Sequence, residues 1–443
     1  MKLFAMISLI ICSYSQTEIP KILSMQERAE VRDRLLADRL ETILPKLMDE
    51  EKIDMWIIIA REYNEDPVIR TMLPAKWITA RRRTILVFHR NSSALEKLAV
   101  ARYDVGIFKK AWDKEEEPNQ WKRLADLIAE KKPKTIGLNL SETYAHADGL
   151  TKTEYDQFVK HLSKTDQSKI KSAETLAVRW LETRSEMEMT IYPQIVKIAH
   201  RIILEGLSEQ VIQPGVTSTE DVEWWYRERI RELKLITWFH PSVSIQREKQ
   251  ELAGNLIAGR EMTNIIMPGD LIHIDFGITY LGLNTDTQEH AYVLKTGENQ
   301  APKGIRDALI KGNRLQDILT SQIKSGRNGN QILKSTLDQA KSEGLRPSVY
   351  THPIGFHGHA AGPAIGMWDS QGGVAGTGDF IMHANTAFSI ELNVTVSIPE
   401  WNDQNIRIML EEDGFYTGND FYYIDGRQKE LILIPRAEPT NRQ

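Results

Sequence analysis

Four carboxylates interrupt apolar, strand-like segments in the second half of the chain, and they restrict the fold more than any other feature. Asp275 lies on the predicted polar face of a strand whose opposite face, with Ile272 and Ile274, is apolar. Asp286 follows 11 residues later, across a predicted turn. Glu391 and Glu411 lie in two further apolar segments. A carboxylate in an apolar strand is costly unless it is paired or binds a cation. A single pair of aspartates would suit an ordinary turn, but four such carboxylates predict a shared site.

A histidine-rich segment lies between the second and third of these carboxylates. Residues 352–359 read HPIGFHGH and contain His352, His357 and His359. Four carboxylates and one imidazole form a hard, oxygen-rich ligand set that suits two divalent ions, manganese, cobalt, iron or zinc, bridged by carboxylates and by water or hydroxide. If the segment were only a polar loop, the carboxylates would lack a nitrogen ligand, so we favour the metal site.

The length of 443 residues and a hydrophobic content of 41% suggest two domains. In the first part, strand-like segments alternate with helical ones, which indicates an α/β domain with a mixed sheet. No glycine-rich phosphate loop is found there. The second part begins with long helices and becomes rich in strands. The expected strands of the first part are 53–59, 84–88, 98–103 and 135–138; the expected helices are 26–51, 151–162, 183–208, 219–235 and 303–343.

The N-terminus has the pattern of a secretory signal peptide. Lys2 precedes an apolar run, and the small residues Ser13 and Ser15 follow in a small-x-small cleavage pattern, so we predict a signal peptide over 1–15, a first domain over 16–178 and a second over 179–443. Cys12, the single cysteine, would leave with this peptide; lipidation of Cys12 is the alternative, although Ile11 before it is bulky. We therefore expect an exported protein, periplasmic or secreted, whose mature form has no disulfide and no membrane partner.

These motifs resemble those of the pita-bread metallopeptidase family, which includes aminopeptidase P, prolidase and methionine aminopeptidase. The resemblance rests on the order of two aspartates 11 residues apart, a His-x-x-Gly segment, a glutamate in the strand SIEL and a last glutamate followed by acids. It extends over the whole mature chain. It implies a creatinase-like N-terminal α/β domain followed by a pita-bread catalytic domain.

The resemblance also implies roles for individual residues. His352 with Gly355 fits the metal-binding histidine of the family, and His359, seven residues later, fits the acid-base or transition-state histidine. Glu391 would also transfer the proton of the attacking water. Glu412 and Asp413 compete with Glu411 for the last ligand position, which strand alternation and the following acids assign to Glu411. The implied ligands of two divalent ions are Asp275, Asp286, His352, Glu391 and Glu411.

The chain departs from the family around the substrate pocket. The arginine of the family lies two residues before the last glutamate, whereas Arg407 lies four before Glu411. The histidine expected shortly before Asp275 is missing, and Ser348 stands where another would be. His240 could compensate, or it could be a structural histidine beside a proline turn. His240 and Arg407 are therefore only candidate substrate-binding residues.

The sequence thus predicts a dinuclear metal-dependent exopeptidase that acts on Xaa-Pro or related short peptides. We expect it to form a homodimer. The net charge of −5 gives no indication of nucleic-acid binding. Two alternatives remain open. One is an exported, metal-stabilised protein of this fold without peptidase activity, and the other is a creatinase-like, metal-free hydrolase of an amide or amidine. The identity of the metal and the substrate are not specified by the sequence.

Overall fold

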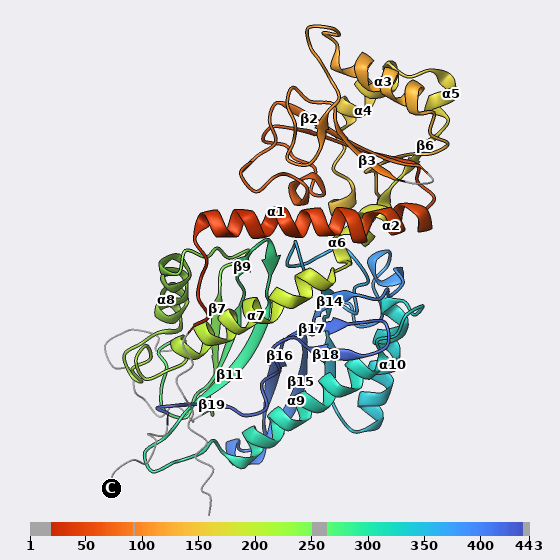
Figure 1. Cartoon of the computed structure of the whole chain (residues 1–443). Coiled ribbons are helices and arrows are strands. Elements are labelled where there is room, and N and C mark those ends of the chain that lie inside the picture. The colour runs from red at the N-terminus through yellow and green to blue at the C-terminus, as the bar shows by residue number, and fades with distance from the viewer. Residues whose placement is uncertain (1–18, 92–93, 250–263, 437–443) are drawn as a thin grey trace, which may run out of the picture.

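The computed structural model describes residues 19–91, 94–249 and 264–436. The predicted signal peptide and Cys12 lie outside these residues. Figure 1 shows an upper N-terminal part and a lower C-terminal part, with helix α1 lying between them.

The N-terminal part is built on a mixed sheet. Its helices are α1 (Met25–Thr42), α2 (Leu44–Glu50), α3 (Gln120–Lys131), α4 (Lys152–Lys160), α5 (Lys164–Gln167) and α6 (Glu174–Glu182), with short 3-10 turns η1 (Ile69–Thr71) and η2 (Ala145–Ala147). Its strands are β1 (Met55–Arg61), β2 (Arg83–Arg90), β3 (Leu95–Ala99), β4 (Lys109–Lys110), β5 (Ile136–Leu138) and β6 (Ile170–Ser172), in the order β4-β3-β2-β1-β5-β6.

Both faces of this sheet are covered by helices, because β1 is apolar at every position except its last. Trp56 and Ile58 pack in the cluster that contains residues of α1, α2 and α6. Ile57 and Ile59, which point to the opposite face, pack in the cluster that contains residues of α3 and α4. The α/β class predicted from the sequence is therefore present, with helices on both sides of the sheet.

Helix α1 connects the two parts through one buried arginine. Arg39 is 1% exposed and its Nη1 lies 2.6 Å from Glu188 Oε2 at the start of the C-terminal part. The same guanidinium donates to the carbonyl oxygens of Trp180 and Thr183. A buried charge with a charged partner and further hydrogen bonds fixes the position of the helix.

The C-terminal part contains three further sheets and a hairpin. Its helices are α7 (Glu186–Gly206), α8 (Thr219–Glu232), α9 (Lys303–Gln322) and α10 (Gly329–Ser342), with 3-10 turns η3 (Thr377–Asp379) and η4 (Pro399–Trp401). Its strands are β7 (Ser242–Gln246), β8 (Leu271–Phe276), β9 (Thr279–Tyr280), β10 (Leu283–Asn284), β11 (Thr287–Val293), β12 (Pro347–Val349), β13 (His352–Pro353), β14 (Thr386–Ser389), β15 (Leu392–Ile398), β16 (Gln404–Leu410), β17 (Asp413–Tyr416), β18 (Phe421–Tyr423) and β19 (Ile432–Ile434).

The strands are ordered β19-β11-β8-β7, β12-β15-β16 and β13-β14-β17-β18, and β9 pairs with β10. Helices α7 and α8 pack with β8 and β11 in one apolar cluster, and α9 and α10 pack with β15 and β16 in another. Strand β8 contributes to both clusters, since Ile272 and Ile274 belong to the first and Leu271 to the second. We predicted a polar face for this strand, but both of its faces are covered.

Three predicted elements differ in the structure. The helix expected over 26–51 is interrupted at Ile43, because Pro45 in the first turn of α2 has no N–H to donate. The helix expected over 303–343 is two helices, separated by Gly326 at a φ of +81° and restarted by an Asn328 capping box. The strand expected over 98–103 begins earlier and ends at Ala99, because β3 pairs with β2 from Leu95 onward. The expected domain division after residue 178 falls within α6 and stays a prediction.

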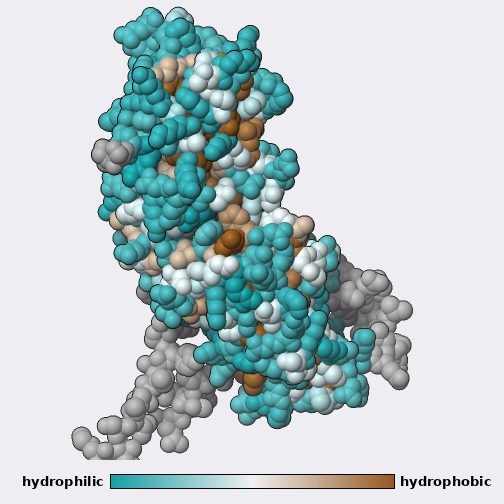
Figure 2. All heavy atoms as spheres, turned by 90° about the vertical axis from the view of Figure 1, so that its right-hand side faces the viewer, coloured by the Kyte–Doolittle hydropathy of each residue, from teal (hydrophilic) through white to brown (hydrophobic). Residues whose placement is uncertain are grey.

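No helix of the described residues is long and apolar enough to cross a membrane. Figure 2 shows a largely hydrophilic face with small hydrophobic patches, one of them near the junction of the two parts.

Candidate metal centre

Two antiparallel strands bring the two aspartates together. Strand β8 pairs with β11 so that Asp275 lies opposite Gln288, and Asp286 immediately precedes β11. Residues 281–282 turn the chain between β9 and β10, with φ angles of +56° and +86° that suit a tight hairpin turn. Oxygen atoms of Asp275, Asp286 and Glu411 all lie within 4.8 Å of one another.

The other three ligand candidates lie where the chain passes from one sheet to another. Strand β12 pairs with β15, but β13, which begins at His352, pairs with β14. Glu391 lies between β14 and β15, and Glu411 lies between β16, which pairs with β15, and β17, which pairs with β14. The prediction that Glu391 lies within a strand is therefore wrong. Its backbone instead passes from one sheet to the next, so Glu391 lies at the junction of β14 and β15.

His352 is oriented to bind a cation. Its Nδ1 lies 3.0 Å from the carbonyl oxygen of Pro353, which fixes the proton on Nδ1 and leaves Nε2 with a free electron pair. That Nε2 is buried, has no hydrogen-bond partner and lies 3.7 Å from both Asp286 Oδ2 and Glu411 Oε1. Asp275 Oδ1 is also buried without a partner. These unpartnered atoms and the carboxylates around them fit a divalent ion.

The carboxylates of this cluster strongly affect one another. Burial raises the pKa of Asp286 well above its ordinary value, and the charges of Glu411 and Asp275 raise it further. Burial and Glu411 raise the pKa values of Asp275 and Glu391 in the same way. Ionised oxygens so close together repel, and a divalent ion removes that repulsion.

Gln288 is a site residue that we did not predict from the sequence. Its Nε2 donates to Glu411 Oε2 at 2.7 Å and to Glu391 Oε1 at 3.1 Å. Its Oε1 lies 2.9 Å from His273 Nε2, which must then be the donor. Burial lowers the pKa of His273 to about 4, so this histidine is neutral at neutral pH. Gln288, which His273 orients, therefore fixes one carboxylate oxygen each of Glu391 and Glu411.

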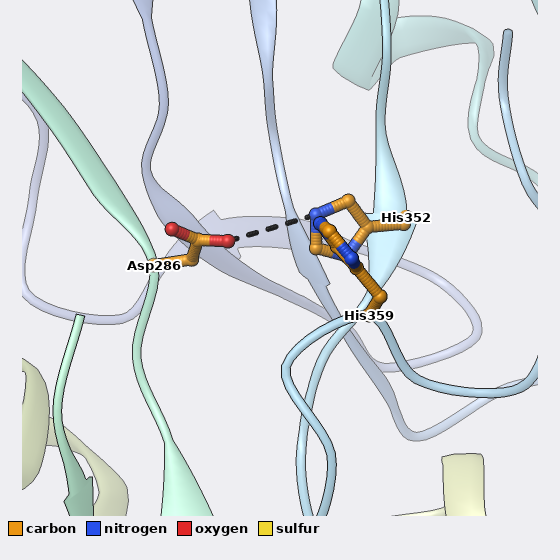
Figure 3. A group of neighbouring side chains, drawn as sticks. All are labelled: Asp286, His352 and His359. Carbon is orange, nitrogen blue, oxygen red and sulfur yellow. Dashed lines mark ion pairs between the residues drawn. The ribbon is translucent and has the colours of Figure 1, made fainter. Parts of the chain in front are cut away.

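His359 lies at the edge of the cluster. Its ring centroid is 4.6 Å from that of His352, and Figure 3 shows both rings on the side of the site opposite Asp286. The ring centroids of Trp238 and Tyr350 lie 5.1 and 5.9 Å, respectively, from the ring centroid of His359. We did not predict these two residues from the sequence. Burial, His352 and His146 lower the pKa of His359, so it is a neutral group with one N–H to donate.

The two acids that follow Glu411 point elsewhere. Glu412 Oε2 lies 3.0 Å from His200 Nε2, and Asp413 accepts the backbone N–H of Asp286. Of the three competing acids, only Glu411 is grouped with His352 and Glu391.

The two candidate substrate-binding residues are not brought into this cluster. His240 lies against α8, with its ring 5.2 Å from Trp224 and its Nδ1 3.1 Å from Arg227. Arg407 is exposed on β16, where its backbone bonds to the side chain of Gln246. Across the described ranges, neither side chain has a hydrogen bond or ion pair with a ligand candidate.

Comparison with known proteins agrees with this geometry. The sequence pattern of metallopeptidase family M24 matches residues 194–417, half of the chain. The chain belongs to this family. The matched range holds all five ligand candidates of this member of family M24, together with His359. Among curated proteins, none matches the sequence.

Solved structures resemble this member of family M24 along most of its length. The X-Pro aminopeptidase of Thermotoga maritima is 17% identical, with a TM-score of 0.60 over 88% of this chain and 99% of that one. The Xaa-Pro dipeptidase of Bacillus anthracis is 17% identical, with a TM-score of 0.56 over 93% and 100%. A dipeptidase of Mycobacterium ulcerans is 16% identical, with a TM-score of 0.58 over 92% and 99%. The predicted family and fold, a pita-bread part after an N-terminal α/β part, are confirmed.

Proposed function

We propose that this metallopeptidase is an exopeptidase that holds two divalent ions. It cleaves Xaa-Pro or related bonds, either removing the N-terminal residue before proline or splitting a short proline-containing peptide. The observation that carries the proposal is the free Nε2 of His352, buried 3.7 Å from two carboxylates. The printed names of the structural relatives, an X-Pro aminopeptidase and an Xaa-Pro dipeptidase, support the substrate class.

Five residues would hold the ions: Asp275, Asp286, His352, Glu391 and Glu411. Ions bound there would supply an activated water and polarise the carbonyl of the scissile bond. The carboxyl group of Glu391, whose pKa is raised by burial, would take the proton of that water and pass it to the leaving nitrogen. The neutral His359 would donate its N–H to the carbonyl oxygen as negative charge develops. Trp238 and Tyr350 would confine the His359 ring.

The first test removes a ligand. His352→Ala and Asp286→Ala should lose bound metal in elemental analysis, and turnover of Ala-Pro peptides should fall by at least about a thousand-fold, because metal activation of water is lost. His89→Ala is a matched control, since His89 is a buried histidine in the N-terminal sheet that pairs with Glu96. Full activity in a metal-depleted ligand variant would contradict the proposal.

The same elemental analysis separates the alternatives. Two ions per chain support the exopeptidase, and none would support a creatinase-like hydrolase. Two ions without turnover of any peptide would support a metal-stabilised protein that lacks peptidase activity. We also propose that residues 1–15 direct export and that the enzyme assembles as a homodimer. A mature N-terminus near Gln16, found in the culture medium or the periplasm, would support export.

A further inference from the structure

Phe356 lies in the loop between the two histidines of the site, and two buried arginines lie over its ring. This histidine loop runs from His352 to His359. The guanidinium carbons of Arg39 and Arg184 are each 4.8 Å from the centre of the Phe356 ring. Arg39 belongs to α1, which lies between the two parts of the molecule in Figure 1, and Arg184 precedes α7. The ring therefore connects the histidine loop with two segments that are distant from it in the sequence.

The two arginines share one acid. Arg39 Nη1 lies 2.6 Å from Glu188 Oε2, and Arg184 Nη1 lies 2.9 Å from Glu188 Oε1. Both arginine side chains are at most 1% exposed, and in the part of the chain that the structure describes no other acid pairs with either guanidinium. The Nε atoms of both arginines are buried without a hydrogen-bond partner. Two buried positive charges thus share one negative charge, which is costly unless another group stabilises the second cation.

The face of the Phe356 ring provides such a group. An aromatic face carries partial negative charge, and its attraction for a guanidinium is largest where water is excluded. Gly355 brings the backbone of the histidine loop equally close, since a Cβ there would be only 3.0 Å from Arg184 Cζ. The two arginines therefore attract the loop through the ring, and the glycine leaves room for its backbone.

The same loop is also tied to the chain that leads to a ligand candidate. The carbonyl oxygen of Gly355 accepts the backbone N–H of Asn284 at 2.8 Å and its Nδ2 at 3.0 Å. Asn284 ends β10 and lies two residues before Asp286. Only two residues separate Phe356 from His359, so a displacement of the ring is passed on to this histidine and is not absorbed by a long connection.

We infer that Arg39 and Arg184 are positioning residues, which hold the histidine loop through the ring of Phe356 so that His359 faces the candidate metal centre. The inference rests on the proposed function, in which His359 donates to the scissile carbonyl. The N-terminal part then supports the reaction without touching the substrate, because one of the two guanidiniums comes from α1. Loss of the attraction should lower kcat, since this donor acts on charge that develops in the transition state, and should change KM and metal content little.

Fluorination of the Phe356 ring tests the contact, because fluorine withdraws negative charge from the ring face and changes the shape of the ring little. In the full metal-loaded chain, one, two and three fluorines should lower kcat for Ala-Pro-Gly stepwise, to about a tenth with three, while KM stays within about two-fold. Phe88 of β2 is the matched control. It is buried against Trp56 and Phe108, and among the described residues no guanidinium lies over its ring. The same fluorination at Phe88 should leave kcat unchanged.

A double-variant cycle separates positioning from general support of the fold. Phe356→Leu keeps an apolar side chain but removes the aromatic face, so it should lower kcat by about ten-fold, whereas Phe356→Tyr keeps the face and should stay within about three-fold of the parent. If the ring acts through His359, Phe356→Leu should cost less than about two-fold in a His359→Ala background. A flat fluorine series, or equal losses in both backgrounds, would overturn the inference while the peptidase proposal stands.

If the parent cleaves no peptide, nuclear magnetic resonance of isotope-labelled histidine rings decides. The signal of His359 is identified by its absence in His359→Ala. It should move as fluorines are added at Phe356 and should stay in place when they are added at Phe88. Such a movement would support the positioning although the proposed function had failed, and an unchanged signal would overturn it.

Discussion

Each part of the molecule contains a network of buried polar groups, and the two networks differ in whether these groups find partners within the protein. In the N-terminal part, Asp66 accepts the backbone N–H groups of Val68 and Ile69 and the side-chain amide of Asn139, whose oxygen accepts from Trp56 Nε1. In the C-terminal part, acids are buried beside other acids, and His352 Nε2 and Asp275 Oδ1 have no partner. The first network is complete within the protein. The second requires something that the protein must bind.

The largest expected effect tests this contrast directly. In metal-free protein near pH 8, Asp286→Asn should raise the free energy of unfolding by about 1–3 kcal/mol, because it removes a repelling buried charge. Asn139→Ala should lower it by about 1–3 kcal/mol, since Asp66 and Trp56 lose a partner. Urea titrations measure both. A loss of stability in metal-free Asp286→Asn would show that the two networks do not differ in this way.

The pH dependence of the same unfolding sharpens the test. The folded-state pKa of Asp286 is raised above its unfolded value, so its contribution to stability is present at low pH and is lost as the pH rises through the raised value. The metal-free parent should therefore lose stability as the pH rises. Asp286→Asn should show a flatter dependence, and saturating metal should remove most of the loss.

A smaller effect is expected at Gln288. Gln288→Leu should weaken metal binding by about ten- to hundred-fold, because the outer oxygens of Glu391 and Glu411 lose their donor. Calorimetry with Mn²⁺ measures the affinity, and circular dichroism checks the fold. His273→Ala should also weaken Mn²⁺ binding, but by a smaller factor, because it removes only the group that orients Gln288. An affinity within two-fold of the parent in Gln288→Leu would mean that this residue only fills space.

The smallest effect is expected at His240. Because its ring is held by Trp224 and Arg227, His240→Ala should change kcat/KM for Xaa-Pro and Xaa-Ala peptides by less than about two-fold. His240 then does not replace the histidine that is missing before Asp275, and preference for proline should be weak. A ten-fold loss specific to Xaa-Pro peptides would show that His240 moves into the pocket during turnover.

The sequence indicated the ligand candidates because their chemistry is local: an acid among apolar residues stands out wherever it occurs. It did not indicate Gln288, Trp238 or Tyr350, whose roles arise from contacts across strands. Glu391 shows the same limit, since alternation predicted a strand where the chain changes sheets. Pairing partners decide such a change, and they are distant in the sequence.

The buried arginine of α1 has a consequence for the order of synthesis. Arg39 is 149 residues before its partner Glu188. At about 5–20 residues per second, a ribosome needs roughly 7–30 seconds to make that partner after it has made the arginine. Most strands of the N-terminal sheet are made well before then, and β6 is complete 16 residues before Glu188, but α1 cannot complete its buried contacts. For that interval the nascent chain carries a cation whose counterion has not yet been translated, and its first helix must remain at the surface of the emerging protein.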